Sequence, residues 1–234
     1  MVEGVIQFES RHVDAPPLPA SWTRLLEPVR HRLVAAHLIG RDPERYGGVG
    51  YGNASIRIEA ARSLRWAHAH RLALPGGEAS RPFAITSSGF AAEPLSPATY
   101  TLVDAADASR NLVVSAGPRP PSSESMTHAA VYAASSGLRC VLHVHDPSFW
   151  RAALLNRPDN LGLVEAGIPY GTPAMSRAIS AIASTTRFSG AIMAGHDDGW
   201  LVWAATPAEA LERLDGLRAG FGLRAWAGWP RSRR

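Results

Sequence analysis

Histidine side chains are the residues of this sequence best placed to do chemistry. His143-Val-His145 ends an apolar run, 138–145, that is typical of a buried strand. Residues i and i+2 of a strand point to the same side, so both imidazoles can reach one ion at about 2.0 to 2.1 Å. His196 ends a second apolar segment, 190–196, and is the best third ligand. The alternative is a structural His-x-His pair without a metal.

His68-Ala-His70 repeats the same spacing in a different setting. No acidic or glycine signature accompanies this pair in the surrounding stretch. We therefore expect no chemical role for His68 and His70.

Glu124 is the candidate acid or base. A carboxylate beside a metal can hold or relay the proton that the field of the cation makes labile. The alternative is a charge that stabilises a helix N-terminus, since the preceding Ser122 and Ser123 are good N-cap residues. The same exposed amides and hydroxyls can also seat a phosphate.

Two further segments have both a turn interpretation and a binding interpretation. Asn53 follows a glycine-rich stretch, and Ser87-Ser88-Gly89 follows a short apolar segment. Such residues usually form turns, but they also offer hydroxyl, amide and backbone donors to an anion. Asp197 and Asp198 form a predicted hairpin turn, in which one carboxylate can hold His196 by its second ring nitrogen.

The elements that must position these residues alternate between strands and helices. Apolar spacing predicts a helix over 22–37, with Pro28 tolerated in its first turns. Glu124 to about Ser135 is a predicted helix that ends at Gly137, and Thr206 opens a capping box for a helix to about Leu217. Further helices are expected over 149–155 and 175–185. Predicted strands cover 54–58, 83–86, 100–103, 112–115, 138–145, 190–196 and 200–204.

Composition limits the possible chemistry. The chain has 234 residues, and all 24 positive residues are arginine, which excludes a lysine Schiff base. A single cysteine, Cys140, excludes an internal disulfide and leaves histidine and carboxylate as metal ligands. The arginines are scattered, so the net charge of +4 predicts no nucleic-acid partner, and the seven tryptophans are expected in the core or in subunit contacts. The absence of an 18-residue apolar segment and of a signal peptide predicts a cytoplasmic protein without a membrane partner.

The order of these motifs resembles the class II aldolase/adducin family, which includes fuculose-phosphate aldolases. The likeness rests on 52–57 (Gly-Asn-Ala-Ser-Ile-Arg), 85–89 (Ile-Thr-Ser-Ser-Gly), 122–128 (Ser-Ser-Glu-x-x-x-His), His143-x-His145, and His196 before a hairpin. It divides the chain into an N-terminal arm (1–21), the family domain (22–217) and a C-terminal tail (218–234).

By this resemblance, His143, His145 and His196 match three zinc-binding histidines, and Glu124 matches the acid that ligates the metal or moves a proton. Positions that hold the substrate phosphate are matched by Asn53, Ser88, Gly89, Ser122 and Ser123. The implied fold is a three-layer α/β/α sandwich with a central, mainly antiparallel sheet, and the implied assembly is a homotetramer.

The implied activity is that of a zinc-dependent lyase, with another divalent transition metal as the alternative cofactor. It would cleave or form a C–C bond of a small hydroxy-carbonyl compound, such as a sugar phosphate, through an enediolate. The alternatives are an epimerase, dehydratase or decarboxylase with the same site, or a non-catalytic adducin-like assembly domain.

This chain departs from the family pattern at two places. Gly50 stands where a threonine often precedes the asparagine by three residues, which removes a hydroxyl from the phosphate site. His196-Asp197-Asp198-Gly199 replaces the usual His-Gly. The additional acidic turn changes the space or the charge beside the metal.

Overall fold

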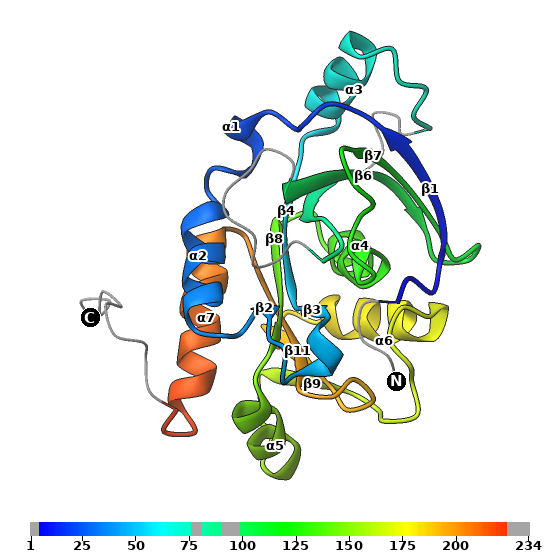
Figure 1. Cartoon of the computed structure of the whole chain (residues 1–234). Coiled ribbons are helices and arrows are strands. Elements are labelled where there is room, and N and C mark those ends of the chain that lie inside the picture. The colour runs from blue at the N-terminus through cyan, green and yellow to red at the C-terminus, as the bar shows by residue number, and fades with distance from the viewer. Residues whose placement is uncertain (1–4, 76–80, 90–98, 224–234) are drawn as a thin grey trace.

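A nine-stranded sheet forms the centre of the computed structural model, which describes residues 5–75, 81–89 and 99–223 (Figure 1). Its spatial order is β1-β7-β6-β5-β4-β8-β11-β10-β9. The strands are β1 (Glu9–Asp14), β4 (Asn53–Arg57), β5 (Phe83–Thr86), β6 (Tyr100–Asp107), β7 (Leu112–Gly117), β8 (Cys140–His145), β9 (Leu161–Val164), β10 (Gly190–Met193) and β11 (Gly199–Ala204). A separate pair joins β2 (Gly40–Arg41) to β3 (Gly50–Tyr51).

The sheet is mixed. The two outermost pairs, β1 with β7 and β10 with β9, are parallel. The pairs between them are antiparallel. The expected antiparallel arrangement therefore describes the interior of the sheet and not its edges.

Helices pack on the sheet through two separate hydrophobic clusters. Their bounds are α1 (Ala20–Thr23), α2 (Glu27–Ala35), α3 (Ala60–Ala69), α4 (Ser125–Ala134), α5 (Pro147–Leu155), α6 (Pro173–Ala183) and α7 (Pro207–Ala219). One cluster joins α2, α5 and α7 to Leu142 and Val144 of β8. The other joins α4 and α6 to Val141. Alternation along β8 thus sends neighbouring residues into different clusters.

The helix predicted over 22–37 is wrong as a single element. The chain forms α1 and α2 with a break between them, and Pro28 lies in the first turn of α2. Proline lacks a backbone N–H and so suits a helix start. The strand predicted over 100–103 extends to Asp107, and α3, β1 and β9 were not predicted.

Residues that precede the first predicted helix take part in the sheet. β1 pairs with β7, from Glu9 beside Leu112 to Asp14 beside Gly117. Part of the N-terminal arm is therefore an edge strand.

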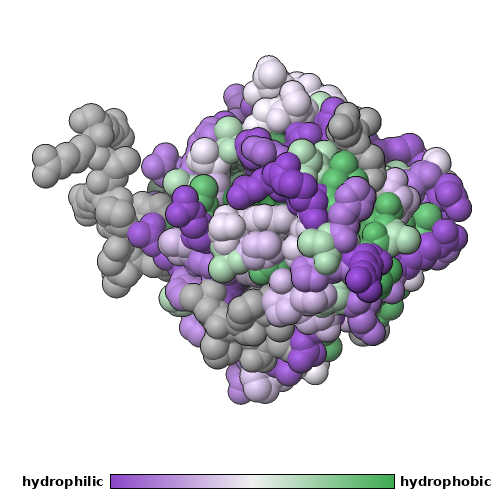
Figure 2. All heavy atoms as spheres, turned by 90° about the horizontal axis from the view of Figure 1, so that it is seen from above, coloured by the Kyte–Doolittle hydropathy of each residue, from purple (hydrophilic) through white to green (hydrophobic). Residues whose placement is uncertain are grey.

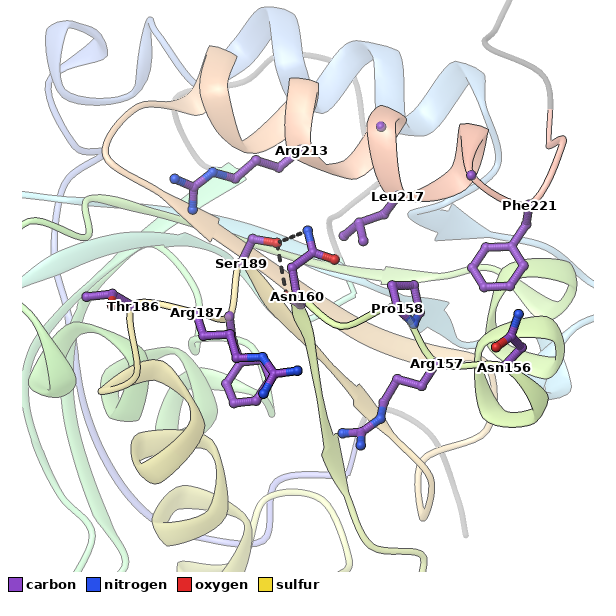
Figure 3. Close-up of a pocket in the computed structure, with 13 residues that line it drawn as sticks. Asn156, Arg157, Pro158, Asn160, Thr186, Arg187, Ser189, Arg213, Leu217 and Phe221 are labelled. Carbon is purple, nitrogen blue, oxygen red and sulfur yellow. Dashed lines mark hydrogen bonds between the residues drawn. The ribbon is translucent and has the colours of Figure 1, made fainter.

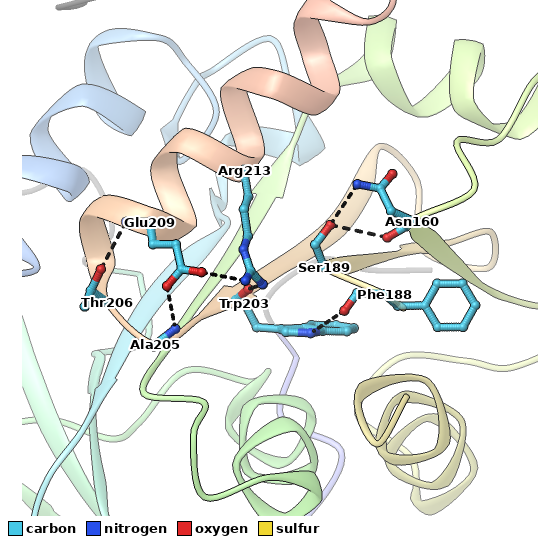
Figure 4. Close-up of polar contacts among 8 residues, drawn as sticks. All are labelled: Asn160, Phe188, Ser189, Trp203, Ala205, Thr206, Glu209 and Arg213. Atoms are coloured by element: carbon cyan, nitrogen blue, oxygen red, sulfur yellow. Dashed lines mark hydrogen bonds and ion pairs between the residues drawn. The ribbon is translucent and has the colours of Figure 1, made fainter. Parts of the chain in front are cut away.

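Helix α7 is anchored to the sheet at its N-terminus (Figure 4). Thr206 caps the helix by accepting from Glu209 N, as in a capping box. Glu209 in turn accepts from Ala205 N, the residue before the N-cap, and not from Thr206 N. Arg213 donates to Glu209 and to the carbonyl oxygen of Trp203 in β11. These contacts fix β11, the strand that lies between the two histidine-bearing segments.

The face seen in Figure 2 carries many hydrophilic side chains interspersed with small apolar areas. Among the described residues, we find no helix both long enough and apolar enough to span a membrane.

Candidate metal centre

Strand β8 places His143 and His145 on the same side of the sheet. Both side chains are fully buried. β8 lies between β4 and β11, so its backbone is paired on both sides. The pairing with β4 extends to His143, and the pairing with β11 extends to His145. This double pairing fixes the strand end that carries the two imidazoles.

His196 approaches the pair from the turn after β10. Its backbone N–H donates to Met193 O and its carbonyl accepts from Gly199 N, which closes the turn before β11. One ligand atom from each of His143, His145 and His196 lies within 4.8 Å of the others. The three ring centroids are 4.9 to 5.0 Å apart. The structure thus brings the three predicted ligands together, within reach of a single ion.

Burial keeps the imidazoles of His143 and His145 in the neutral form that binds metal. It lowers the pKa of His143 well below 6.5, and the neighbouring His145, His196 and His128 lower it further. The pKa of His145 is lowered well below 6.5 by burial, then by His196 and Arg45. Nε2 of His143 is buried without a hydrogen-bond partner. Two neutral rings and an unpartnered nitrogen fit a divalent cation.

Glu124 lies beside the cluster at the start of α4. It is the N-cap residue of that helix and is 1% exposed. Its Oε1 lies 3.8 Å from His196 Nδ1. The Ser122 hydroxyl accepts from Glu124 N, and Ser125 Oγ donates to Ser122 O. The turn that caps the helix therefore also directs the carboxylate toward the histidines.

Asn53 contacts one of the predicted ligands directly. Its Nδ2 lies 3.1 Å from His143 Nδ1, while its Oδ1 is buried without a partner. If the amide turns by 180°, Oδ1 accepts from Nδ1–H and the lone pair of His143 Nε2 is available to a metal. Asn53 can thus set the tautomer of His143.

The other predicted substrate-binding residues converge near the same end of the sheet. Ser88 N donates to Pro120 O, and Ser87 forms a bridge with Pro121, which precedes Ser122 and Ser123. A Cβ on Gly50 would lie 3.2 Å from the Cα of Gly89. Backbone contacts therefore bring together the segments that contain Asn53, Ser88 with Gly89, and Ser122 with Ser123.

Aromatic residues that the sequence analysis missed enclose the cluster. Tyr170 stacks on His196 with ring centroids 4.7 Å apart. Tyr46 and Tyr51 contact His145 at centroid distances of 4.9 and 5.7 Å. The glycine-rich sequence around both tyrosines predicts a loop without regular structure. It does not predict that this loop lies over His145, because that position depends on long-range packing.

The remaining sequence candidates lie away from the cluster or in the core. His68 on α3 and His70, the C-cap residue of that helix, are both exposed. The side chains of Trp22, Trp66, Trp200 and Trp203 are buried in the hydrophobic clusters, as expected for core residues. Trp226 and Trp229 lie outside the described residues.

A cavity of about 660 Å³ lies elsewhere, beside α7 and the starts of β9 and β10 (Figure 3). His196, in contrast, follows the other end of β10. The arginines that line this cavity already have protein partners: Arg187 pairs with Asp159, Arg213 with Glu209, and Arg157 donates to Leu161 O. None of the predicted site residues lines it.

Comparison with known families agrees with this geometry. Residues 42–220 match the family described as Class II Aldolase and Adducin N-terminal domain. The fold is thus that of a class II aldolase-type domain. The chain belongs to the class II aldolase/adducin family.

Solved structures share the fold at low sequence identity. A sugar-phosphate aldolase from Thermotoga maritima is 14% identical with a TM-score of 0.59, covering 87% of this chain and 93% of that one. YgbL from Klebsiella pneumoniae, a putative aldolase/epimerase/decarboxylase, is 17% identical with a TM-score of 0.53, covering 89% and 93%. The L-fuculose-1-phosphate aldolase from Thermus thermophilus is 19% identical with a TM-score of 0.51, covering 86% and 92%. Comparison with curated proteins found no match.

Proposed function

We propose that this protein is a zinc-dependent lyase that cleaves or forms a C–C bond of a small hydroxy-carbonyl compound. One observation carries the proposal: three buried histidines present ligand atoms within 4.8 Å of one another, with Glu124 beside them. Three imidazole ligands suit Zn²⁺, and the other divalent transition metals that imidazole accepts are the alternatives.

His143, His145 and His196 would hold the metal. When bound, such an ion polarises a carbonyl and stabilises the negative charge that develops on oxygen as the C–C bond breaks. Glu124 would accept or return the proton at its carboxylate, which lies 3.8 Å from His196. Burial of Glu124 excludes bulk water from that transfer.

The segments around Gly89 and Ser122 would bind the anionic end of the substrate. The donors would be the hydroxyl groups of Ser88, Ser122 and Ser123, the backbone N–H of Gly89 and the side-chain amide of Asn53. Support comes from the backbone contacts that join Ser87 and Ser88 to Pro120 and Pro121. A sugar phosphate is the first substrate class to test.

The test is metal content together with turnover. We expect about one zinc ion per chain in protein purified without chelator, and turnover with at least one member of a panel of aldoses, ketose phosphates and hydroxy acids. His143→Ala and His145→Ala should lose both, whereas Glu124→Gln should retain zinc and lose turnover by at least about 100-fold. His68→Ala with His70→Ala is the matched control, because these two histidines have the same spacing and are both exposed. Wild-type protein without bound metal would refute the proposal.

Product analysis separates the lyase from its alternatives. An epimerase, a dehydratase and a decarboxylase would use the same ligands and the same proton-transfer residue. Their products would be a stereoisomer, a dehydrated compound with loss of water, or a compound one carbon shorter with release of carbon dioxide. A non-catalytic adducin-like domain would give no product from any substrate. A cytoplasmic location and a homotetrameric assembly are part of the proposal and are tested by fractionation and by sedimentation.

A further inference from the structure

Two non-glycine residues with left-handed backbone flank the histidine cluster and bond to each other. Tyr46 has φ +49° and Asp198 has φ +62°. The Tyr46 hydroxyl donates to Asp198 Oδ2 at 2.7 Å, although the two residues are 152 positions apart. Strained backbone of this kind persists where the surrounding structure holds it, and such strain clusters at functional sites.

Arg45 completes this arrangement. Its guanidinium donates to the hydroxyls of Tyr46 and Tyr51, at 2.9 and 3.1 Å, and to the carbonyl oxygen of His145 at 3.5 Å. It also lies over the Tyr51 ring, 4.3 Å from its centroid. The loop that begins at Arg45 is therefore bonded to the end of β8.

One end of the arrangement contacts a predicted metal ligand, and the other end lies in the turn that follows a second one. The Tyr46 ring packs edge-on against His145, at a centroid distance of 4.9 Å and an interplanar angle of 74°. Asp198 lies in the turn that follows His196, and its carbonyl accepts from the backbone N–H of Asp146, the residue after His145. The Tyr46–Asp198 bond thus closes a loop of contacts that runs from His145 to the turn of His196.

We propose that Arg45, Tyr46 and Asp198 form a clamp that positions His145 relative to His196 and so retains the metal. The carboxylate of the clamp comes from the acidic turn in which this chain departs from the His-Gly pattern of its family. Tyr46 and Asp198 act on the metal through the histidines and not as ligands. This inference rests on the proposed metal site.

Zinc dissociation and a cobalt spectrum test the clamp. Tyr46→Phe keeps the ring against His145 and removes the bond to Asp198. Tyr51→Phe is the matched control, because it also removes a hydroxyl bonded to Arg45 but leaves the bond between Tyr46 and Asp198. We expect Tyr46→Phe to release zinc to a chelator about tenfold faster than wild type and to shift the visible absorption of Co²⁺-loaded protein. Tyr51→Phe should stay within about twofold, with the wild-type spectrum.

Substitutions at Asp198 give a second, independent measurement. Asp198→Gly removes the acceptor and suits a φ of +62°, so zinc release should rise as in Tyr46→Phe. Asp198→Asn keeps an acceptor oxygen and should restore most of the retention. The clamp is refuted if wild type binds zinc while Tyr46→Phe and Asp198→Gly release it at the wild-type rate, or if the control Tyr51→Phe releases it as fast as Tyr46→Phe. Wild-type protein that binds no zinc refutes the proposed function as well.

Discussion

Burial decides what the individual histidines can do. His143 and His145 have pKa values well below 6.5 because their charged forms would lose solvation in the protein interior. At neutral pH both rings are therefore neutral, which suits the metal-ligand role proposed for them and not a proton carrier. Proton transfer is accordingly proposed for Glu124, the carboxylate beside them.

Asn53 has two candidate roles, which a pair of substitutions can separate. Its amide contacts His143 Nδ1, and loss of a partner that orients a ligand commonly costs about 10-fold to 100-fold in metal affinity. We expect Asn53→Ala to weaken zinc binding by about that factor in a chelator competition. Ser88→Ala, which alters only the predicted anion site, should leave zinc affinity unchanged. Equal zinc affinity of Asn53→Ala and wild type would limit Asn53 to substrate binding.

At the scale of elements, close backbone approach holds the site together. Gly52 joins β3 to β4 with φ +66°, and a Cβ there would lie 2.9 Å from the carbonyl oxygen of His143 and 2.6 Å from Ile39 Cγ2. Only glycine allows the segment before Asn53 to lie this close to β8. The loop and the strand that carries two ligands are therefore fixed as one unit.

Gly52→Ala tests this approach. A carbonyl oxygen in a paired strand has little room to move, so we expect a loss of about 3 kcal/mol in the free energy of unfolding, measured in urea. Gly222→Ala is the control, because Gly222 also has a positive φ of +67° but has nothing within 4 Å of the added Cβ. Its cost should be only about 1 kcal/mol, from backbone strain. Similar losses in the two variants would contradict the steric argument.

Elements specified by local sequence were predicted better than those that depend on distant partners. The alternation in β8, the turn before β11 and the start of α7 could be read directly, because each depends on neighbouring residues. β1 could not, because its pairing with β7 joins residues that lie far apart in the chain, such as Glu9 and Leu112. The same holds for Tyr46, whose contact with His145 depends on where a glycine-rich loop folds back.

At the scale of the whole molecule, the ion pair of Asp146 and Arg218 joins the site to the C-terminal helix. Arg218 Nε donates to Asp146 Oδ2 at 2.6 Å, and Asp146 Oδ1 accepts from Phe149 N to cap α5. Asp146 directly follows His145. The end of β8, the start of α5 and the end of α7 are therefore mutually dependent, and we expect a change in one to displace the proposed metal ligands.

The buried histidines should make the metal-free fold sensitive to acid. His128 Nδ1 forms a hydrogen bond with Ser55 Oγ, and Ser55 Oγ forms a second one with the Tyr132 hydroxyl. Burial lowers the pKa of His128 to about 3. An unfolded histidine has a pKa of about 6.5, so below that pH the unfolded chain binds a proton that folded His128 does not. The contribution of His128 to the free energy of unfolding is therefore complete above about pH 6.5. As the pH falls below that value, this contribution falls by about 1.4 kcal/mol per pH unit until the pKa of folded His128 is reached.

Unfolding of chelator-treated protein in urea at about pH 7.5 and about pH 5.0 measures this effect. His128→Asn keeps an amide near Ser55 but cannot take up the proton, so its stability should fall about 2 kcal/mol less between the two pH values than that of wild type. His68→Asn, at an exposed position on α3, should follow wild type. His143 and His145 contribute in the same direction, because burial lowers their pKa values as well, so His128→Asn should still lose stability in acid. If the wild-type protein and His128→Asn lose the same stability between these pH values, His128 in the folded chain takes up its proton by about pH 5.0, which contradicts the lowered pKa.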